Sequence, residues 1–106
     1  MLYLFVEKQL ALIELELKFL GLWASESPSV EALADPTPFA CESMSFEHWL
    51  QFILIPKMSV LIEQRDSLPS NIALTPMAEH LWHHRAEMSR LIYLINQLDE
   101  CLSEPR

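Results

Sequence analysis

The sequence predicts an all-α fold, specifically a four-helix bundle with a long proline-containing loop between the first and second main helices. Apolar residues make up 51% of the chain and recur at steps of three and four, the spacing that places side chains on one helix face. Only one of the 106 residues is glycine, which disfavours sandwiches and barrels because their tight turns need positive φ angles. The length fits a single helical domain over residues 1–106.

The first helix is expected over residues 2–23, where the apolar stripe is longest. Its members are Leu2, Val6, Leu10, Ile13, Leu17 and Leu20. Four further apolar residues widen the stripe beyond a coiled-coil seam; they are Phe5, Leu12, Phe19 and Leu22. Such a helix is expected to pack against two neighbours or more. Glu14 and Lys18 lie one turn apart on the opposite face, which predicts an ion pair.

The helical pattern breaks between residues 24 and 44. Three prolines forbid a continuous helix there, namely Pro28, Pro36 and Pro38. Ser27 and Pro28 can start a short helical turn that ends near Leu33. Residues 35–39 are expected to run extended, because a residue that precedes proline avoids the α region. Phe39 is the expected anchor that holds this loop onto the bundle.

The second main helix is expected to start after Ser45, which can cap it, and to end near Gln64. Met44 and Trp49 occupy the two positions of a hydrophobic staple. Pro56 lacks an N–H and crowds the carbonyl one turn before it, so it predicts a kink within one helix.

Two more helical segments follow a connector over residues 67–74. Thr75 and Pro76 fit an N-cap followed by proline at the first helical position. The last apolar stripe consists of Met88, Leu91, Ile95, Leu98 and Leu102. The pattern leaves open whether these segments form one rod or break near His83 and His84.

The charge balance bears on partners and location. The chain has 7 Lys and Arg against 15 Asp and Glu, and residues 19–56 contain no basic residue. This charge opposes direct binding of nucleic acid, which depends on basic side chains at phosphates. It fits either simple solubility or the steering of a basic partner. Ionised residues interrupt residues 1–23, so we expect no signal peptide, no membrane helix and a cytoplasmic protein.

The central part of the chain carries a family resemblance. Residues 38–44 read Pro-Phe-Ala-Cys-Glu-Ser-Met, and residues 47–58 read Glu-His-Trp-Leu-Gln-Phe-Ile-Leu-Ile-Pro-Lys-Met. This pattern resembles the YqcC-like family of small bacterial proteins. The resemblance implies a four-helix domain of unassigned biochemical function. It also implies an accessory role near tRNA modification, because family members are found alongside a tRNA pseudouridine synthase whose name has been transferred to them.

The sequence does not fit that enzyme itself. A pseudouridine synthase needs a catalytic Asp in a large mixed α/β domain with a basic RNA-binding face, and the length, helical pattern and charge here all disagree. The paired carboxylates Asp99 and Glu100 lie among polar residues and are expected to be solvated. We therefore predict a protein that is not an enzyme, with no catalytic residue and no cofactor.

One group of residues has a metal-like spacing. His80, His84 and Glu87 fall at i, i+4 and i+7, which would place three donors on one face of a helix. A solvated helix face is the simpler interpretation. A metal-dependent enzyme built on these residues is the third of three functional hypotheses.

The first hypothesis is a helical interaction module whose surface comprises the loop over residues 36–44 and the helix over residues 46–58. Its aromatic and apolar residues exceed what a small bundle needs for its core, which predicts a protein partner or self-association. The surface residues predicted are Phe39, Met44, Trp49, Phe52, Pro56 and Met58. The second hypothesis is a bundle that binds a small apolar ligand in a pocket between helices, gated by the same loop.

Overall fold

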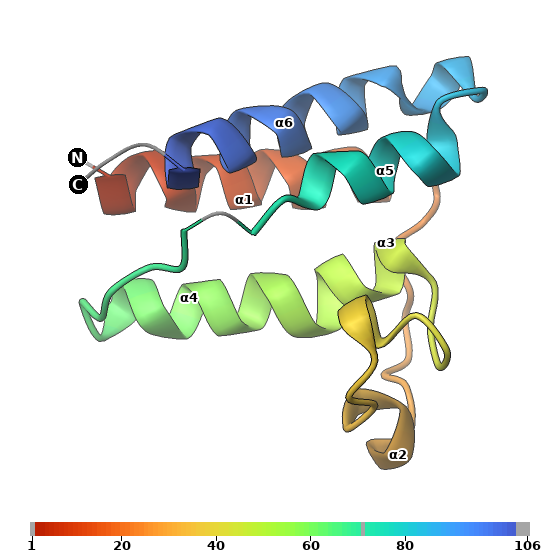
Figure 1. The fold of residues 1–106 in the computed structure, drawn as a ribbon, viewed down its shortest axis with the longest axis horizontal. Helices are drawn as coiled ribbons and strands as arrows, with labels where there is room; N and C mark the ends of the chain where they lie inside the picture. The colour runs from red at the N-terminus through yellow and green to blue at the C-terminus, as the bar shows by residue number, and fades with distance from the viewer. Residues whose placement is uncertain (1, 71, 104–106) are drawn as a thin grey trace.

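The computed structural model describes residues 2–70 and 72–103, and these residues contain helices and no strand (Figure 1). In chain order the elements are α1 (Leu2–Phe19), α2 (Val30–Leu33), the 3-10 turn η1 (Pro38–Ala40), α3 (Phe46–Trp49), the π-helical turn η2 (Leu50–Leu54), α4 (Ile55–Glu63), α5 (Leu74–Trp82), the 3-10 turn η3 (Ala86–Met88) and α6 (Ser89–Ser103). The all-α class is confirmed. The described chain has more helical elements than the four predicted, because short turns form inside the predicted loops.

The first helix ends earlier than predicted, at Phe19 instead of residue 23. Gly21 adopts a φ of 75°, the left-handed conformation that glycine accepts without strain. The Gly21 N–H donates to the Lys18 carbonyl at 3.1 Å, and the Leu22 N–H donates to the Leu17 carbonyl at 2.9 Å. These two bonds close the last turn and direct the chain away from the helix axis. The predicted Glu14–Lys18 ion pair is present at 2.9 Å.

Residues 46–63 form one continuous helix from α3, η2 and α4, which we call the central helix. The prediction of a single helix through Pro56 is confirmed. The strain of the proline is absorbed just before it, where η2 has π-helical geometry over Leu50–Leu54. A wider turn accommodates a missing N–H and a ring that would crowd the carbonyl of Phe52. Ser45 occupies the N-cap position, but its hydroxyl makes no capping bond in the described structure.

The third and fourth segments are separate helices that fold back on one another (Figure 1). The predicted cap at Thr75 is wrong, and so is the solvated role of Asp99. The Asp99 carboxylate on α6 accepts the Leu74 N–H at 3.0 Å, and the Thr75 N–H and hydroxyl at 2.6 Å each. Pro76 has no N–H, so Asp99 satisfies the donors of residues 74–76. The start of α5 is therefore fixed by a residue on the neighbouring helix.

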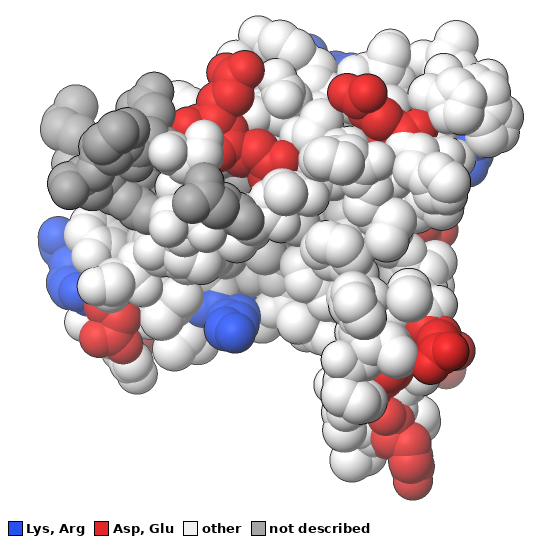
Figure 2. Space-filling model, viewed as in Figure 1, with Lys and Arg blue, Asp and Glu red and all other residues white. Residues whose placement is uncertain are grey.

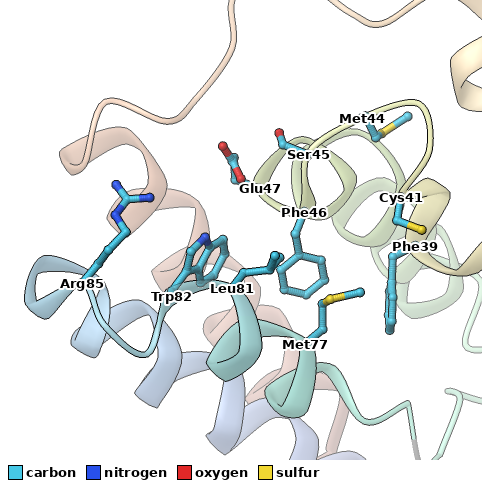
Figure 3. Close-up of a pocket in the computed structure, with 10 residues that line it drawn as sticks. All are labelled: Phe39, Cys41, Met44, Ser45, Phe46, Glu47, Met77, Leu81, Trp82 and Arg85. Atoms are coloured by element: carbon cyan, nitrogen blue, oxygen red, sulfur yellow. The ribbon is translucent and has the colours of Figure 1, made fainter.

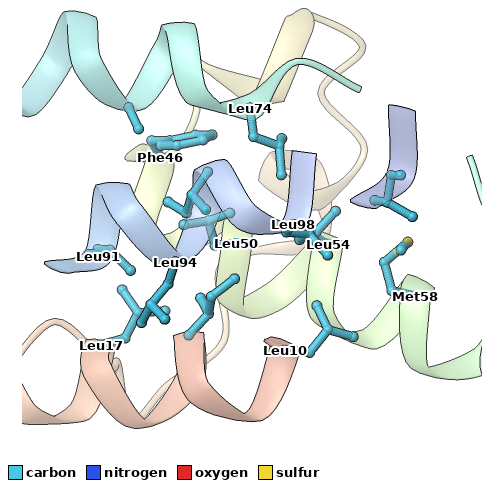
Figure 4. Close-up of a cluster of buried hydrophobic side chains, with 14 of the residues drawn as sticks. Leu10, Leu17, Phe46, Leu50, Leu54, Met58, Leu74, Leu91, Leu94 and Leu98 are labelled. Carbon is cyan, nitrogen blue, oxygen red and sulfur yellow. The ribbon is translucent and has the colours of Figure 1, made fainter. Parts of the chain in front are cut away.

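The core lies between two layers, with α1, α5 and α6 on one side and the central helix on the other (Figure 1). Figure 4 shows leucines of α1, the central helix and α6 converging there. Two buried glutamines bond the backbone: Gln9 donates to the Leu94 carbonyl at 2.9 Å, and Gln51 bonds both backbone groups of Ala24 at 2.8 Å. Gln51 thereby fixes the segment after α1 onto the central helix. None of the described helices is long and apolar enough to cross a membrane.

Candidate functional site

The loop between α2 and the central helix is shaped by a local turn at Asp35. Asp35 Oδ1 accepts the Thr37 N–H at 2.9 Å and the Thr37 hydroxyl at 2.7 Å. These bonds favour the carboxylate, so the Thr37 backbone N–H and hydroxyl hold the pKa of Asp35 below its ordinary value. The prediction that residues 35–39 run extended is wrong at its end, because Pro38–Ala40 form the turn η1.

Two consecutive residues of this loop adopt left-handed backbone conformations. Phe39 has a φ of 58° and Ala40 a φ of 48°. Such angles cost energy for residues with a Cβ, so packing must hold them. Ala40 is buried, and Phe39 packs against the hydrophobic core as expected of an anchor. The loop is therefore held in one shape by its side chains.

An aromatic cluster forms where this loop meets the two helical layers. We define it as Phe39, Phe46, Trp49 and Trp82. The Phe39 ring meets Phe46 and Trp49 edge-on, with centroids 5.5 and 5.0 Å apart. Phe46 stacks on Trp49 at 5.8 Å and lies 5.5 Å from Trp82 of α5. These geometries are favourable for aromatic pairs, so the cluster is a rigid connection between the loop, α3 and α5.

On one side of the cluster lies a first cavity of about 270 Å³, between the loop and α5 (Figure 3). Its lining residues are Phe39, Cys41, Met44, Ser45, Phe46, Glu47, Met77, Leu81, Trp82 and Arg85. The lining is mainly aromatic and sulfur-containing, with one acidic residue, Glu47, and one basic residue, Arg85. Methionine side chains adapt to varied partners, and the two charges can orient a bound segment.

A second cavity of about 410 Å³ lies between the central helix and the connector to α5. Its lining residues are Phe39, Trp49, Ile53, Leu54, Lys57, Met58, Leu61, Ser67, Leu68, Pro69, Ile72 and Leu74. Lys57 is the one charged residue among them. Figure 2 shows the surface between α4 and α5 hollowed and largely uncharged, while acidic side chains gather over the region of α2. Phe39 is the residue that lines both cavities.

The structure brings together only part of the predicted surface. Phe39 and Met44 line the first cavity, and Phe39 and Trp49 line the second. Phe52 packs instead beside His48, with ring centroids 6.2 Å apart, and Pro56 is exposed. Neither lines these two cavities. Met58 is wrong as a surface residue, because it is only 1% exposed and lies in the core at the floor of the second cavity.

The metal hypothesis for His80, His84 and Glu87 is contradicted by the local geometry. It required one helix through all three residues, but α5 ends at Trp82. Glu87 instead pairs with Arg85 at 3.1 Å; its own backbone N–H and the Arg85 guanidinium hold its pKa below the ordinary value. Within residues 2–70 and 72–103, no group of three His, Cys, Asp or Glu side chains is placed to hold a metal ion.

Sequence reasoning missed the contribution of α5 and the connector to both cavities. Met77, Leu81 and Arg85 complete the first cavity, and Leu68 and Ile72 help to complete the second. These residues are remote in sequence from the loop, so no local pattern connects them with it. Met77 and Leu81 gave one usable signal, since residues four apart share one helix face and two apolar residues there can form one wall.

A family model described as tRNA pseudouridine synthase C (DUF446) matches residues 5–101. The chain belongs to the YqcC-like family. It is 32% identical to an uncharacterized protein of Haemophilus influenzae over 94 residues, which span 89% of each chain. It is 31% identical to the uncharacterized protein YqcC of Escherichia coli over 74 residues, covering 70% of this chain and 68% of that protein.

Two further comparisons concern a longer protein and a solved fold. A protein of Pectobacterium carotovorum named tRNA pseudouridine synthase C is 26% identical over 100 residues, which span 94% of this chain but only 27% of that protein. The solution NMR structure of Escherichia coli YqcC matches with a TM-score of 0.88, covering 99% of this chain and 91% of that one. Because its sequence identity is 24%, this match supports the fold alone. The family's described relatives include uncharacterized proteins, so the family gives no established biochemical role.

Proposed function

We propose that this YqcC-like chain is a non-enzymatic interaction module, and that its first cavity binds an apolar segment of a partner protein. The observation that carries the proposal is the cavity itself: aromatic and methionine side chains form its walls, and Glu47 and Arg85 lie in its lining (Figure 3). Grooves of this composition accept apolar side chains of a helix or loop, while charged residues select its orientation. We take residues 1–106 as one helical domain.

The partner that we propose is a tRNA pseudouridine synthase, for which this chain would act as an accessory protein. Support comes from the Pectobacterium protein of that name, in which the matched region is only 27% of the length. Nearly three quarters of that protein lies outside the match and can supply a catalytic domain. A connection within one chain keeps two units together at high effective concentration, whereas separate chains need a binding site. We expect such a module to work in the cytoplasm.

The chemistry of the first cavity supports a binding role over a catalytic one. Cys41 and Ser45 are the nucleophile types in its lining, and the lining contains no histidine that could act as their base. The charge of −8 also favours contact with the protein component of a tRNA-modifying complex over contact with RNA.

The test is an isothermal calorimetric titration of the purified synthase of the same organism with the purified chain. We expect a stoichiometric complex and a loss of affinity of at least about tenfold for Leu81→Glu. Leu81 is 38% exposed and lines the first cavity, so the charge enters the cavity with little effect on the core. Val60→Glu is the matched control, because Val60 is 49% exposed and lines neither cavity. The absence of binding, or equal effects of both variants, would contradict the proposal.

A second candidate function is the binding of a small amphipathic ligand in the second cavity. Its volume of about 410 Å³ lies within the usual range for ligand sites, and its lining is apolar except for Lys57 and Ser67. A ligand with an apolar body and an anionic group would fit these walls, with its charge directed to Lys57. Dodecanoate is expected to raise the melting temperature of the wild-type chain, and Lys57→Glu to remove that shift while Lys57→Arg keeps it. An equal shift in all three proteins would exclude this candidate.

A further inference from the structure

The outer face of α1 presents an apolar stripe that the fold leaves uncovered. The helix packs against α6 and the central helix through Val6, Leu10, Ile13 and Leu17, which are buried. On the opposite side, five large apolar side chains are exposed: Leu4 by 52%, Phe5 by 44%, Leu12 by 39%, Leu15 by 64% and Phe19 by 83%. The expectation that Phe5, Leu12 and Phe19 would widen the buried stripe is therefore wrong.

The spacing of these residues suits another helix. Phe5, Leu12 and Phe19 are seven residues apart, and Leu15 follows Leu12 by three. Alternating steps of this kind keep side chains on one seam of a helix, as in coiled coils. The stripe is symmetric about Leu12, since Phe5 lies seven residues before it and Phe19 seven residues after it.

The charges beside the stripe fit a second copy better than a strongly charged partner. Lys8 is exposed within the stripe, one turn from both Leu4 and Leu12. Exposed Glu7 and Lys18 and half-buried Glu14 flank the stripe, and Glu14 is paired with Lys18. Two acidic and two basic residues leave this face balanced in a chain with a charge of −8. Two copies can therefore approach through this face without the repulsion that the rest of their surfaces would cause.

The area of the stripe also meets the requirement of a small dimer. The full surface of a large apolar side chain is about 150 to 250 Å². The exposed fractions of these five side chains therefore amount to roughly 500 Å². Two such faces bury roughly 1,000 Å², which is near the lower limit for a specific interface. None of the five residues lines the two cavities at the aromatic cluster, so pairing would leave those cavities open.

We propose that the outer face of α1 is a homodimer interface, in which two copies of α1 pack antiparallel across a two-fold axis near Leu12. This arrangement brings Phe5 of one copy toward Phe19 of the other and covers the apolar stripes of both. The inference concerns a different surface from the proposed function and does not depend on it.

The first test is sedimentation velocity of the full chain over a concentration series from micromolar to hundreds of micromolar. Wild type is expected to shift from monomer to dimer, and Phe19→Glu to weaken the dimer by at least about tenfold. Val60→Glu is the matched control, because it places the same charge on another exposed apolar residue and should leave the dimer intact. Circular dichroism establishes that both variants fold. A wild type that stays monomeric throughout, or equal weakening by both variants, would overturn the proposal.

The second test concerns the antiparallel geometry. Leu12→Cys in a Cys41→Ser, Cys101→Ser background should form a disulfide-linked dimer on mild oxidation, because residues near a two-fold axis meet their own copies. Val60→Cys in the same background should not. Equal crosslinking of the two proteins would overturn the two-fold arrangement. Phe19→Glu should still bind the synthase, so failure of the dimer and failure of the proposed function are distinguishable.

Discussion

At the start of α5, the Asp99 carboxylate accepts the N–H groups of Leu74 and Thr75 together with the Thr75 hydroxyl. The loop before α3 instead keeps Phe39 and Ala40 at positive φ, beside two cavities. The α5–α6 junction is thus stabilised by satisfied polar groups and a close-packed core. The loop is held in a strained shape by its aromatic contacts. The difference indicates that the junction maintains the fold, while the loop presents the binding surface.

The largest effect that separates the two regions should come from the core of the junction. Leu98 on α6 is fully buried, so Leu98→Ala should lower the free energy of unfolding by about 3 kcal/mol. Urea denaturation followed by tryptophan fluorescence measures this change. Leu81→Glu at the first cavity should cost much less stability while it removes partner binding. Equal destabilisation by the two variants would contradict the division into a structural and a binding region.

A smaller loss is expected when the cap of α5 is removed. Asp99→Ala leaves the N–H groups of Leu74 and Thr75 without their acceptor, while the Thr75 hydroxyl keeps Asn96 Oδ1 at 3.4 Å; the loss should cost about 2 kcal/mol. Glu100→Ala is the control, because Glu100 is exposed and should change stability by no more than about 0.5 kcal/mol. Thermal unfolding of the two variants under the same conditions makes the comparison. An equal loss of stability in Glu100→Ala would show that the loss in Asp99→Ala does not come from the missing cap.

Glycine substitution should have opposite signs in the two regions. Ala40 has a φ of 48°, so Ala40→Gly should relieve backbone strain and raise stability by about 0.5 kcal/mol. Ala78 lies buried inside α5, so Ala78→Gly should lower stability by about 1 kcal/mol. Chemical denaturation gives both values. A loss at Ala40 as large as that at Ala78 would show that the loop stores no strain.

The smallest effect concerns the pH dependence of the loop. The pKa of Asp35 is below its ordinary value in the folded chain, so its ionised form stabilises the fold. This contribution is fully present above the ordinary pKa and is lost as the pH falls through the lowered, folded-state pKa. An NMR titration should show the Thr37 amide signal shifting in that acidic range, and Asp35→Asn should abolish the shift. An unchanged shift in Asp35→Asn would assign it to another group.

The sequence predicts the helices well where apolar residues recur in one register, as in α1, the central helix and α6. It also predicts a short turn that ends at Leu33 and the anchoring by Phe39. The predicted start of that turn at Ser27 and Pro28 is wrong, because Ser29 caps it and the helix begins at Val30. The sequence does not predict that Asp99 caps α5, since this contact joins residues that are remote in sequence. The two cavities depend in the same way on α5 and the connector, so only Phe39, Met44, Trp49 and Met58 among their lining residues could be proposed from the sequence. The sequence does not predict which apolar face of α1 stays uncovered, because apolar residues lie on most sides of that helix.

The most direct test of the interaction-module account is hydrogen–deuterium exchange of the chain, alone and with the purified synthase. The account predicts slower exchange in the complex at residues 39–47 and 77–85, which surround the first cavity, and unchanged exchange around Val60 on α4. Leu81→Glu should remove the protection. Unchanged exchange at residues 39–47 and 77–85, or protection confined to α1, would contradict the claim that the first cavity is the binding site.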